Sequence, residues 1–250
     1  MRYFLELSYN GKAYHGWQNQ PNATSVQEVL ENALSTVLNT TVAVVGAGRT
    51  DAGVHASQMF AHFDFETPLD LKDLAYKLNS FLPKDVAVAK VFNTRTDAHA
   101  RFDALSRTYN YNVSIEKNVF DYDFSHKVHA VLDVDAMNAA CKILFEYNNF
   151  QCFSKNKTSV RTYNCVIKEA FWSQKGHQLV FTITADRFLR NMVRAIVGTM
   201  LSIGLGKISA DEMHHIIRSK DRGKAGTSVP AHGLYLVKIV YPEDIKLATK

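Results

Sequence analysis

The order in which the hydrophobic period changes along residues 1–92 is compatible with few folds. Alternating apolar and polar residues predict a strand, and apolar residues three or four positions apart predict a helix. In chain order these patterns predict a strand, a helix, two strands, a helix and a strand, at residues 2–9, 26–38, 41–45, 55–65, 71–81 and 86–92. Ser25 and Glu28 open the first helix with the spacing of a capping box. This order is typical of a ferredoxin-like α+β unit.

The remainder of the chain repeats these kinds of element without repeating the sequence. In chain order we expect a strand, a helix, two strands joined by a turn, two helices and a strand, at residues 106–115, 133–147, 164–174, 177–186, 188–205, 209–219 and 233–241. We therefore predict an α+β fold of two ferredoxin-like (RRM-like) halves, 1–103 and 104–250, sharing a mostly antiparallel sheet with helices on one face and a central cleft. Residues 244–250 are predicted to be a solvated tail.

Composition narrows the class of protein. The chain has 250 residues and is 46% apolar, which is enough for a sizeable core. Its formal net charge of +5 leans toward an anionic partner such as nucleic acid. Three cysteines without a C-x-x-C pair indicate reduced thiols and a cytoplasmic protein. The most apolar helix, 188–205, contains two arginines and is too short to span a bilayer, so no membrane role is expected.

The stretch GAGRTDAGVHA, residues 46–56, joins two predicted strands and has the glycine content of a phosphate-binding loop. It lacks the Lys and Ser/Thr of a Walker A loop, and no helix follows it to bind a phosphate. Its Asp51 could act as a base, a metal ligand or a nucleophile. His55 is the only other ligand type nearby, which argues against a metal. Alternatively, Asp51 or Thr50 only caps a turn.

Arg187 directly precedes the predicted helix 188–205, and Arg190 and Arg194 lie within it. The three arginines are three and four positions apart, so we expect them near one helical face. Arg194 lies among apolar residues, where an unpaired charge is costly. It therefore reaches solvent, pairs with a structural acid, or pairs with Asp51.

Tyr109 and Tyr111 lie two residues apart on a predicted strand, so both side chains face the same way, together with Arg107. Aromatic side chains beside arginines on a strand are suited to stacking on a nucleobase. The same pattern is also that of ordinary core tyrosines, and no RNP1-type octapeptide is present.

Several collinear blocks resemble the TruA family of tRNA pseudouridine synthases. They cover nearly the whole chain: YNGKAYHGWQNQP, SVQEVLENAL, GAGRTDAGVHA, LNSFLPKDVAV, HARFDALSRTYNY, DRFLRNMVRAIVGTML and GLYLVKIVYP. The resemblance implies isomerisation of uridine to pseudouridine at positions 38 to 40 of the tRNA anticodon stem-loop. It also implies a homodimer that needs no metal and no small-molecule cofactor.

The resemblance assigns roles to five residues. Asp51 of GRTDAGVHA matches the catalytic aspartate, and Tyr109 of SRTYNY matches the tyrosine that stacks on the target uracil. Arg194 of NMVRAI matches the arginine that pairs with the aspartate. Arg49 matches an arginine implicated in flipping the base out, and Leu234 of GLYL matches an apolar residue lining the pocket.

Two departures from the family pattern lie outside these positions. The tripeptide YNG at residues 9–11 has Asn10 where the family commonly has the Asp of YDG, and Asn149 stands where the family often has Asp.

Two other functions fit some of the same residues. One is a non-catalytic RNA-binding protein on the same scaffold, and the other is a glycosidase, which usually needs a second carboxylate.

The remaining conspicuous residues are predicted to be structural. Trp17 is expected to anchor a loop, and the three cysteines are expected to lie in the core. The histidine pairs 126/129 and 214/215 lack further metal ligands nearby in the sequence.

Overall fold

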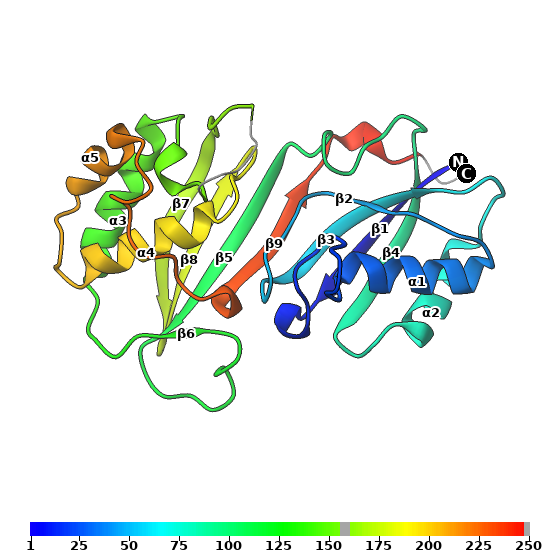
Figure 1. Cartoon of the computed structure of the whole chain (residues 1–250), viewed down its shortest axis with the longest axis horizontal. Helices are drawn as coiled ribbons and strands as arrows, with labels where there is room; N and C mark the ends of the chain where they lie inside the picture. The colour runs from blue at the N-terminus through cyan, green and yellow to red at the C-terminus, as the bar shows by residue number, and fades with distance from the viewer. Residues whose placement is uncertain (156–160, 248–250) are drawn as a thin grey trace. The chain divides into compact units, whose positions relative to one another are not determined.

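The computed structural model describes residues 1–155 and 161–247, and the chain divides into two compact units (Figure 1). Unit 1 is Met1–Leu105 together with the C-terminal segment from Leu236, and unit 2 is Ser106–Tyr235. The predicted halves, 1–103 and 104–250, differ from this division mainly in that last segment. It belongs to unit 1 because Val240 O accepts a hydrogen bond from Leu105 N at 2.8 Å.

Unit 1 is a mostly antiparallel sheet with two helices, and Figure 1 shows the helices side by side against it. Its elements are β1 (Arg2–Tyr9), α1 (Val26–Leu38), β2 (Val45–Gly46), β3 (His55–Asp64), α2 (Leu71–Phe81), β4 (Val86–Thr94) and the main part of β9 (Leu234–Val240). The strand order is β4-β1-β3-β9, and β1 is antiparallel to both β3 and β4.

The helices of unit 1 begin where their capping residues predict. The Ser25 hydroxyl accepts a hydrogen bond from Glu28 N at 3.1 Å, and the Asp70 carboxylate accepts from Lys72 N and Asp73 N at 3.0 Å. Each cap satisfies backbone donors that a helix leaves without a partner in its first turn. Both helices match their predicted ranges, 26–38 and 71–81.

The core of unit 1 lies on both faces of its sheet. Along β1, Tyr3 and Leu5 point to one face and Phe4 to the other, and all three are buried. On the second face Phe4 contacts the rings of Phe92 and Tyr241, with centroids 5.7 and 5.6 Å apart. A sheet buried on both faces holds its loops on a rigid base.

The predicted strand at 41–45 is wrong, because only Val45–Gly46 pairs with β3. The backbone before it bonds to side chains of α1 instead of to a neighbouring strand. Val44 N donates to Glu31 Oε1 at 2.9 Å, and Val42 N donates to Ser35 Oγ at 2.9 Å. These acceptors satisfy the donors that a strand would have used.

Unit 2 has mostly antiparallel strands, and three helices accompany them in Figure 1. Its elements are β5 (Ser106–Ser114), β6 (His126–Lys127), α3 (Val134–Ile143), β7 (Ile167–Lys175), β8 (Gln178–Ala185), α4 (Met192–Gly204) and α5 (Glu212–Ser219). The strand order is β5-β8-β7, antiparallel throughout, and β6 adds a short parallel pairing to β5. Helix α3 packs on α4 and on β7. The predicted α+β class with mostly antiparallel pairing is confirmed.

Three predicted helices of unit 2 are shorter than expected. Helix α4 begins at Met192 rather than 188, because Asn191 takes a left-handed φ of +67° and interrupts the helical backbone. The predicted helix 133–147 ends at Ile143 and continues as a 3-10 turn over Leu144–Glu146. The predicted helix 209–219 begins at Glu212. The turn at Gly176, with φ +59°, is where the sequence places it.

The predicted solvated tail at 244–250 is wrong for the part that the structure describes, which ends at residue 247. Ile245 is buried, and Leu247 N donates to Asn93 O at 3.2 Å. The Lys246 ammonium lies 4.9 Å from the centre of the Phe92 ring. The segment therefore extends the cover over the aromatic face of unit 1.

Candidate active site

Asp51 lies on a loop between β2 and β3, and we call residues 46–55 the aspartate loop. Within it Val54 N donates to Asp51 O at 3.1 Å, which closes a turn. Gly53 takes a φ of +77° in this turn, a conformation that favours glycine. Asp51 is half-buried, so part of it is accessible to solvent.

The three glycines of the aspartate loop differ in whether, and why, the structure requires a glycine at that position. Gly46 lies against the indole of Trp17, and a side chain there would overlap the ring. Gly53 is required by its φ. Gly48 has open space around it and no left-handed φ, so neither its conformation nor its surroundings require a glycine. Trp17 is buried and anchors the loop as predicted.

The side chain and the carbonyl of Thr50 bond to residues outside the turn. Its hydroxyl lies 2.8 Å from the hydroxyl of Tyr9 on β1, in a hydrogen bond that either group can donate. Its carbonyl accepts from Trp17 N at 3.2 Å. The interpretation of Thr50 as a turn cap is therefore wrong, and sequence reasoning missed Tyr9, which lies 41 residues away. Arg49, on the other side of Thr50, is exposed.

The two strand tyrosines of unit 2 have different surroundings. Tyr111 is fully buried, and its hydroxyl donates to Pro230 O at 2.9 Å. Burial raises the pKa of this hydroxyl above its ordinary range. Tyr109 is half-buried and meets the Phe188 ring edge-to-face, with centroids 5.2 Å apart. Tyr111 is thus a core residue, and Tyr109 has the exposed area that a stacking residue requires.

Arg194 lies in the first turn of α4 between buried residues. Its Nε donates to Val229 O at 2.7 Å, and Val229 N donates back to Arg194 O at 3.2 Å. The side chain is half-buried, and this partner is a backbone carbonyl, while the alternatives that the sequence left open for the guanidinium stay predictions. The carbonyl helps to offset the cost of placing a guanidinium in an apolar setting.

The segment bonded by Arg194 belongs to residues 222–233, which we call the return segment. It joins the end of α5 to β9 and positions Leu234, a buried residue at the start of that strand. Val229 O is held by Arg194 and Pro230 O is held by Tyr111. Arg194 and Leu234 are therefore linked through one anchored stretch of backbone in unit 2.

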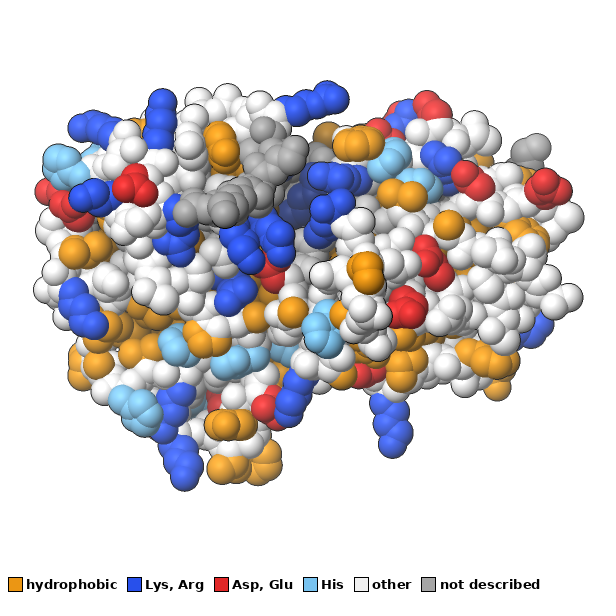
Figure 2. Space-filling view, in the orientation of Figure 1, with side chains coloured by type: hydrophobic (Ala, Val, Ile, Leu, Met, Phe, Trp, Pro, Cys, Tyr) orange, Lys and Arg blue, Asp and Glu red, His pale blue; other side chains and the backbone are white. Residues whose placement is uncertain are grey.

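The predicted common helical face of arginines 187, 190 and 194 is wrong, because the first two precede α4. Arg187 N donates to Asp186 Oδ1 at 2.7 Å in the connection that leads to the helix. Figure 2 shows Lys and Arg side chains gathered over the part of unit 2 that carries α4. This cationic surface suits a polyanionic partner.

The predicted site residues thus fall into two sets. Arg49 and Asp51 share the aspartate loop of unit 1. Tyr109, Arg194 and Leu234 belong to unit 2, as parts of β5, α4 and β9. The pairing of Asp51 with Arg194, under a base stacked on Tyr109, joins the two sets and stays a prediction.

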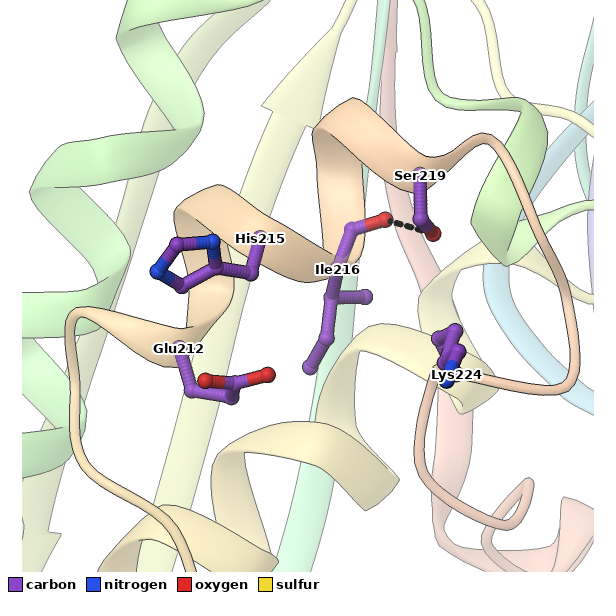
Figure 3. Close-up of a pocket in the computed structure, with 5 residues that line it drawn as sticks. All are labelled: Glu212, His215, Ile216, Ser219 and Lys224. Atoms are coloured by element: carbon purple, nitrogen blue, oxygen red, sulfur yellow. Dashed lines mark hydrogen bonds between the residues drawn. The ribbon is translucent and has the colours of Figure 1, made fainter.

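Metal-binding groups and pockets are two further features that could mark a site away from the predicted site residues. In the described ranges, 1–155 and 161–247, no group of three His, Cys, Asp or Glu side chains is arranged to bind a metal ion. Figure 3 shows a shallow pocket on α5 and the loop that follows it, lined by Glu212, His215, Ile216, Ser219 and Lys224. Its Ser219 hydroxyl donates to Ile216 O at 2.7 Å within the helix itself.

The prediction that the three cysteines lie in the core is confirmed. Cys141, Cys152 and Cys165 are buried, and burial raises the pKa of each thiol to about 12. His214 Nδ1 lies 2.8 Å from the hydroxyl of Tyr147. Within residues 1–155 and 161–247, no helix has the length and apolar character that crossing a membrane requires.

Comparison with known proteins assigns the class of protein. The family model described as tRNA pseudouridine synthase matches residues 7–103 and 140–242. These ranges include the aspartate loop, α4 and the return segment, and they cover most of both units. The chain belongs to this family.

Curated relatives narrow the comparison to one kind of member. The chain is 56% identical to tRNA pseudouridine synthase A of Parabacteroides distasonis, over 98% of this chain and 97% of the relative. It is 52% identical to tRNA pseudouridine synthase A of Bacteroides fragilis, over 98% of each chain. The protein of that name from Syntrophomonas wolfei is 41% identical, over 97% of this chain and 98% of the relative.

Proposed function

We propose that this chain isomerises uridine to pseudouridine in the anticodon stem-loop of tRNA, at positions 38 to 40, with Asp51 as the nucleophile. The observation that carries the proposal is the aspartate loop, in a chain 56% identical over nearly its full length to a tRNA pseudouridine synthase A. Asp51 lies there at a closed turn with a half-buried side chain. This is a position from which a carboxylate can meet a ligand without being lost to the core.

The reaction is an internal rearrangement of one nucleotide. The bond between uracil N1 and the sugar C1′ breaks, the base turns, and a new bond forms between C5 and C1′. The C5 proton leaves and N1 gains a proton, so atoms and charge balance with no redox change. A single ionised carboxylate can carry this chemistry by attack at C1′, by attack at C6 or by assisting a glycal intermediate.

The base needs a surface on which it can turn. Tyr109 supplies a ring held edge-to-face by Phe188 and still half-exposed, and stacking fixes the plane of a base without fixing its edges. The target must first leave the stem, at a cost of a few kcal/mol. Arg49 is exposed beside Asp51 and is suited to assist that step.

Binding to tRNA rests mainly on charge. The chain carries a net +5, and the cationic surface over α4 faces solvent. Contacts from Lys and Arg to phosphates release counterions, so binding should weaken as salt rises. We expect a cytoplasmic enzyme, because its proposed substrate is tRNA. We also expect a homodimer, which the family resemblance implies and light scattering of the purified protein would test.

The decisive experiment measures tritium released from uridine labelled at C5 in an unmodified tRNA transcript. Asp51→Asn removes the nucleophile and keeps its shape, so product formation should fall by at least about 1000-fold while tRNA binding changes little. Asp73→Asn is the matched control, because Asp73 is an exposed carboxylate on α2 that pairs with Lys77, at 2.7 Å.

The outcomes separate the rival functions. Normal release by Asp51→Asn would end the assignment of the nucleophile. A wild-type chain that binds tRNA and releases no tritium would be a non-catalytic RNA-binding protein. Free uracil among the products would indicate a glycosidase.

A further inference from the structure

The residue before the proposed nucleophile is tied to β1 by a buried hydrogen bond. The Thr50 and Tyr9 hydroxyls lie 2.8 Å apart, and their residues are only 8% and 5% exposed. A buried hydroxyl pair is costly to leave unmatched, so each group fixes the position of the other. The bond therefore sets where the backbone stands one residue before Asp51.

The rest of the aspartate loop is held from the same side by residues 10–17, which we call the covering loop. Thr50 O accepts from Trp17 N at 3.2 Å, and Gly53 N donates to Tyr14 O at 3.2 Å. The contacts thus flank Asp51 on both sides in the chain. They constrain its backbone without occupying its carboxylate.

The covering loop is itself rigidly mounted. Gly16 O accepts from Val26 N at 3.2 Å and Trp17 O accepts from Gln27 N at 3.0 Å, which fixes the loop to the first turn of α1. At its other end Gly11 N donates to His55 Nδ1 at 3.1 Å. Both loops are therefore parts of one block with β1, β3 and α1.

We propose that Thr50 is a positioning residue for the isomerisation, acting through its hydroxyl bond to Tyr9 to aim the Asp51 carboxylate at the flipped nucleotide. This inference rests on the proposed function. Covalent catalysis requires the reacting atoms to stand within a few tenths of an ångström of the productive geometry, and small displacements lower rates strongly. Loss of the restraint on the backbone at Thr50, one residue before the nucleophile, would allow such a displacement.

A bond that serves only folding would behave differently. Its loss would lower the stability of unit 1 and leave the rate of the folded enzyme unchanged. Unit 1 offers a matched case, since Tyr3 is also buried on β1 and its hydroxyl donates to Thr67 O at 3.1 Å, outside the aspartate loop. Tyr3→Phe therefore removes a comparable hydroxyl from the same strand without touching the loop.

The test compares Thr50→Val, Thr50→Ser, Tyr9→Phe and Tyr3→Phe by single-turnover release of C5 tritium at saturating enzyme, with tRNA affinity and melting temperature measured alongside. We expect Thr50→Val to slow the single-turnover rate about 100-fold, and Tyr9→Phe to slow it at least about 10-fold. Affinity for tRNA should stay within about twofold in both, because neither side chain reaches the surface.

The conservative variants should restore or preserve the rate. Thr50→Ser keeps the hydroxyl and should stay within a few-fold of the wild type. Tyr3→Phe should lose stability comparable to Tyr9→Phe and retain its rate. The double variant Thr50→Val/Tyr9→Phe should be no slower than Thr50→Val alone, because both substitutions remove the same bond.

Equal rates for Tyr9→Phe and Tyr3→Phe, with Thr50→Val also at the wild-type rate, would overturn the positioning role. Should Thr50→Val fail to fold, Tyr9→Phe decides the question, since it keeps the ring and removes one oxygen atom. A wild-type chain that releases no tritium would refute the proposed function instead, so the two failures give different results.

Discussion

The aspartate loop and the return segment are both irregular, and each is held by side-chain hydrogen bonds and by close contact with glycine backbone. The Tyr9 side chain bonds to Thr50 of the aspartate loop, and the His55 side chain accepts from Gly11 N of the covering loop. The return segment lies directly on α4, where a side chain at Gly198 would overlap Thr227 O. The two differ in where the contacting glycine lies. Gly198 belongs to a regular helix, whereas Gly11 and Gly16, which meet the aspartate loop, belong to the irregular covering loop.

The close approach in unit 2 involves a second glycine. A side chain at Gly226 would stand 2.6 Å from Thr199 N, which is closer than real contacts allow. Gly226 N also donates to the Thr199 hydroxyl at 2.9 Å. A close contact between glycine backbone and another segment leaves no room for an added methyl group. A side-chain hydrogen bond, in contrast, can be removed by deleting a single hydroxyl oxygen. The return segment should therefore respond abruptly to an added atom at these glycines, and the aspartate loop gradually to the loss of its side-chain bonds.

The largest effect is expected for Gly198→Ala. The added methyl group must displace the return segment from α4, which should lower the free energy of unfolding by about 3 kcal/mol. Urea denaturation of the full chain measures this loss. Gly48→Ala in the aspartate loop is the control, because Gly48 has open space and an ordinary φ, and it should change stability by less than about 0.5 kcal/mol. Equal losses for the two variants would remove the contrast between the units.

An intermediate effect is expected from pH, because unit 1 also uses neutral imidazoles as acceptors. His62 is buried, and its Nδ1 accepts from Ala100 N at 3.1 Å. Burial, followed by the nearby Arg2 and His99, lowers the pKa of His62 from 6.5 to about 4, against the opposing charges of two aspartates. The folded state therefore resists a proton that the unfolded state accepts.

This difference fixes the sign of the pH dependence. The stabilisation from neutral His62 is complete above pH 6.5 and is lost progressively as the pH falls from 6.5 to about 4. At pH 5 the loss should be on the order of 2 kcal/mol, measured by urea denaturation at pH 7.5 and pH 5. His62→Asn keeps an acceptor that does not titrate in this range, so its loss between the two pH values should be smaller. An unchanged acid loss in that variant would assign the effect to other groups.

The smallest effect is expected for Tyr111→Phe, which removes one of the side-chain bonds that the return segment does have. Losing the donor to Pro230 O should cost about 1 kcal/mol of stability. Tyr109→Phe, on the same strand and half-exposed, should cost less in the same denaturation measurement. A loss for Tyr111→Phe as large as that for Gly198→Ala would mean that side-chain bonds, and not close backbone contact, fix the return segment.

Prediction from the sequence succeeded where the signal is local. Helices α1 and α2 match their predicted ranges because hydrophobic period and capping residues act within one or two turns. It failed for 41–45, where side chains of α1 take the backbone donors of an expected strand. It also placed the start of α4 four residues too early, since a left-handed Asn191 leaves no mark on the hydrophobic pattern.

The same division applies to the site. The GRTDAGVHA motif identifies Asp51 by itself, since the resemblance rests on contiguous residues. The resemblance selects Tyr109 rather than Tyr111, but the strand pattern alone does not separate them. The structure adds the physical reason, because only distant neighbours decide that Tyr111 is buried.

The sequence alone determined the family, the order of strands and helices and the residue proposed as nucleophile, because each is written in residues close together in the chain. Tertiary structure decided which side chains hold that residue in place. Tyr9 and Thr50 are 41 positions apart, and nothing in either local stretch shows that their hydroxyls meet. Such pairings depend on how β1 and the aspartate loop are brought together by packing, which no short stretch of sequence encodes.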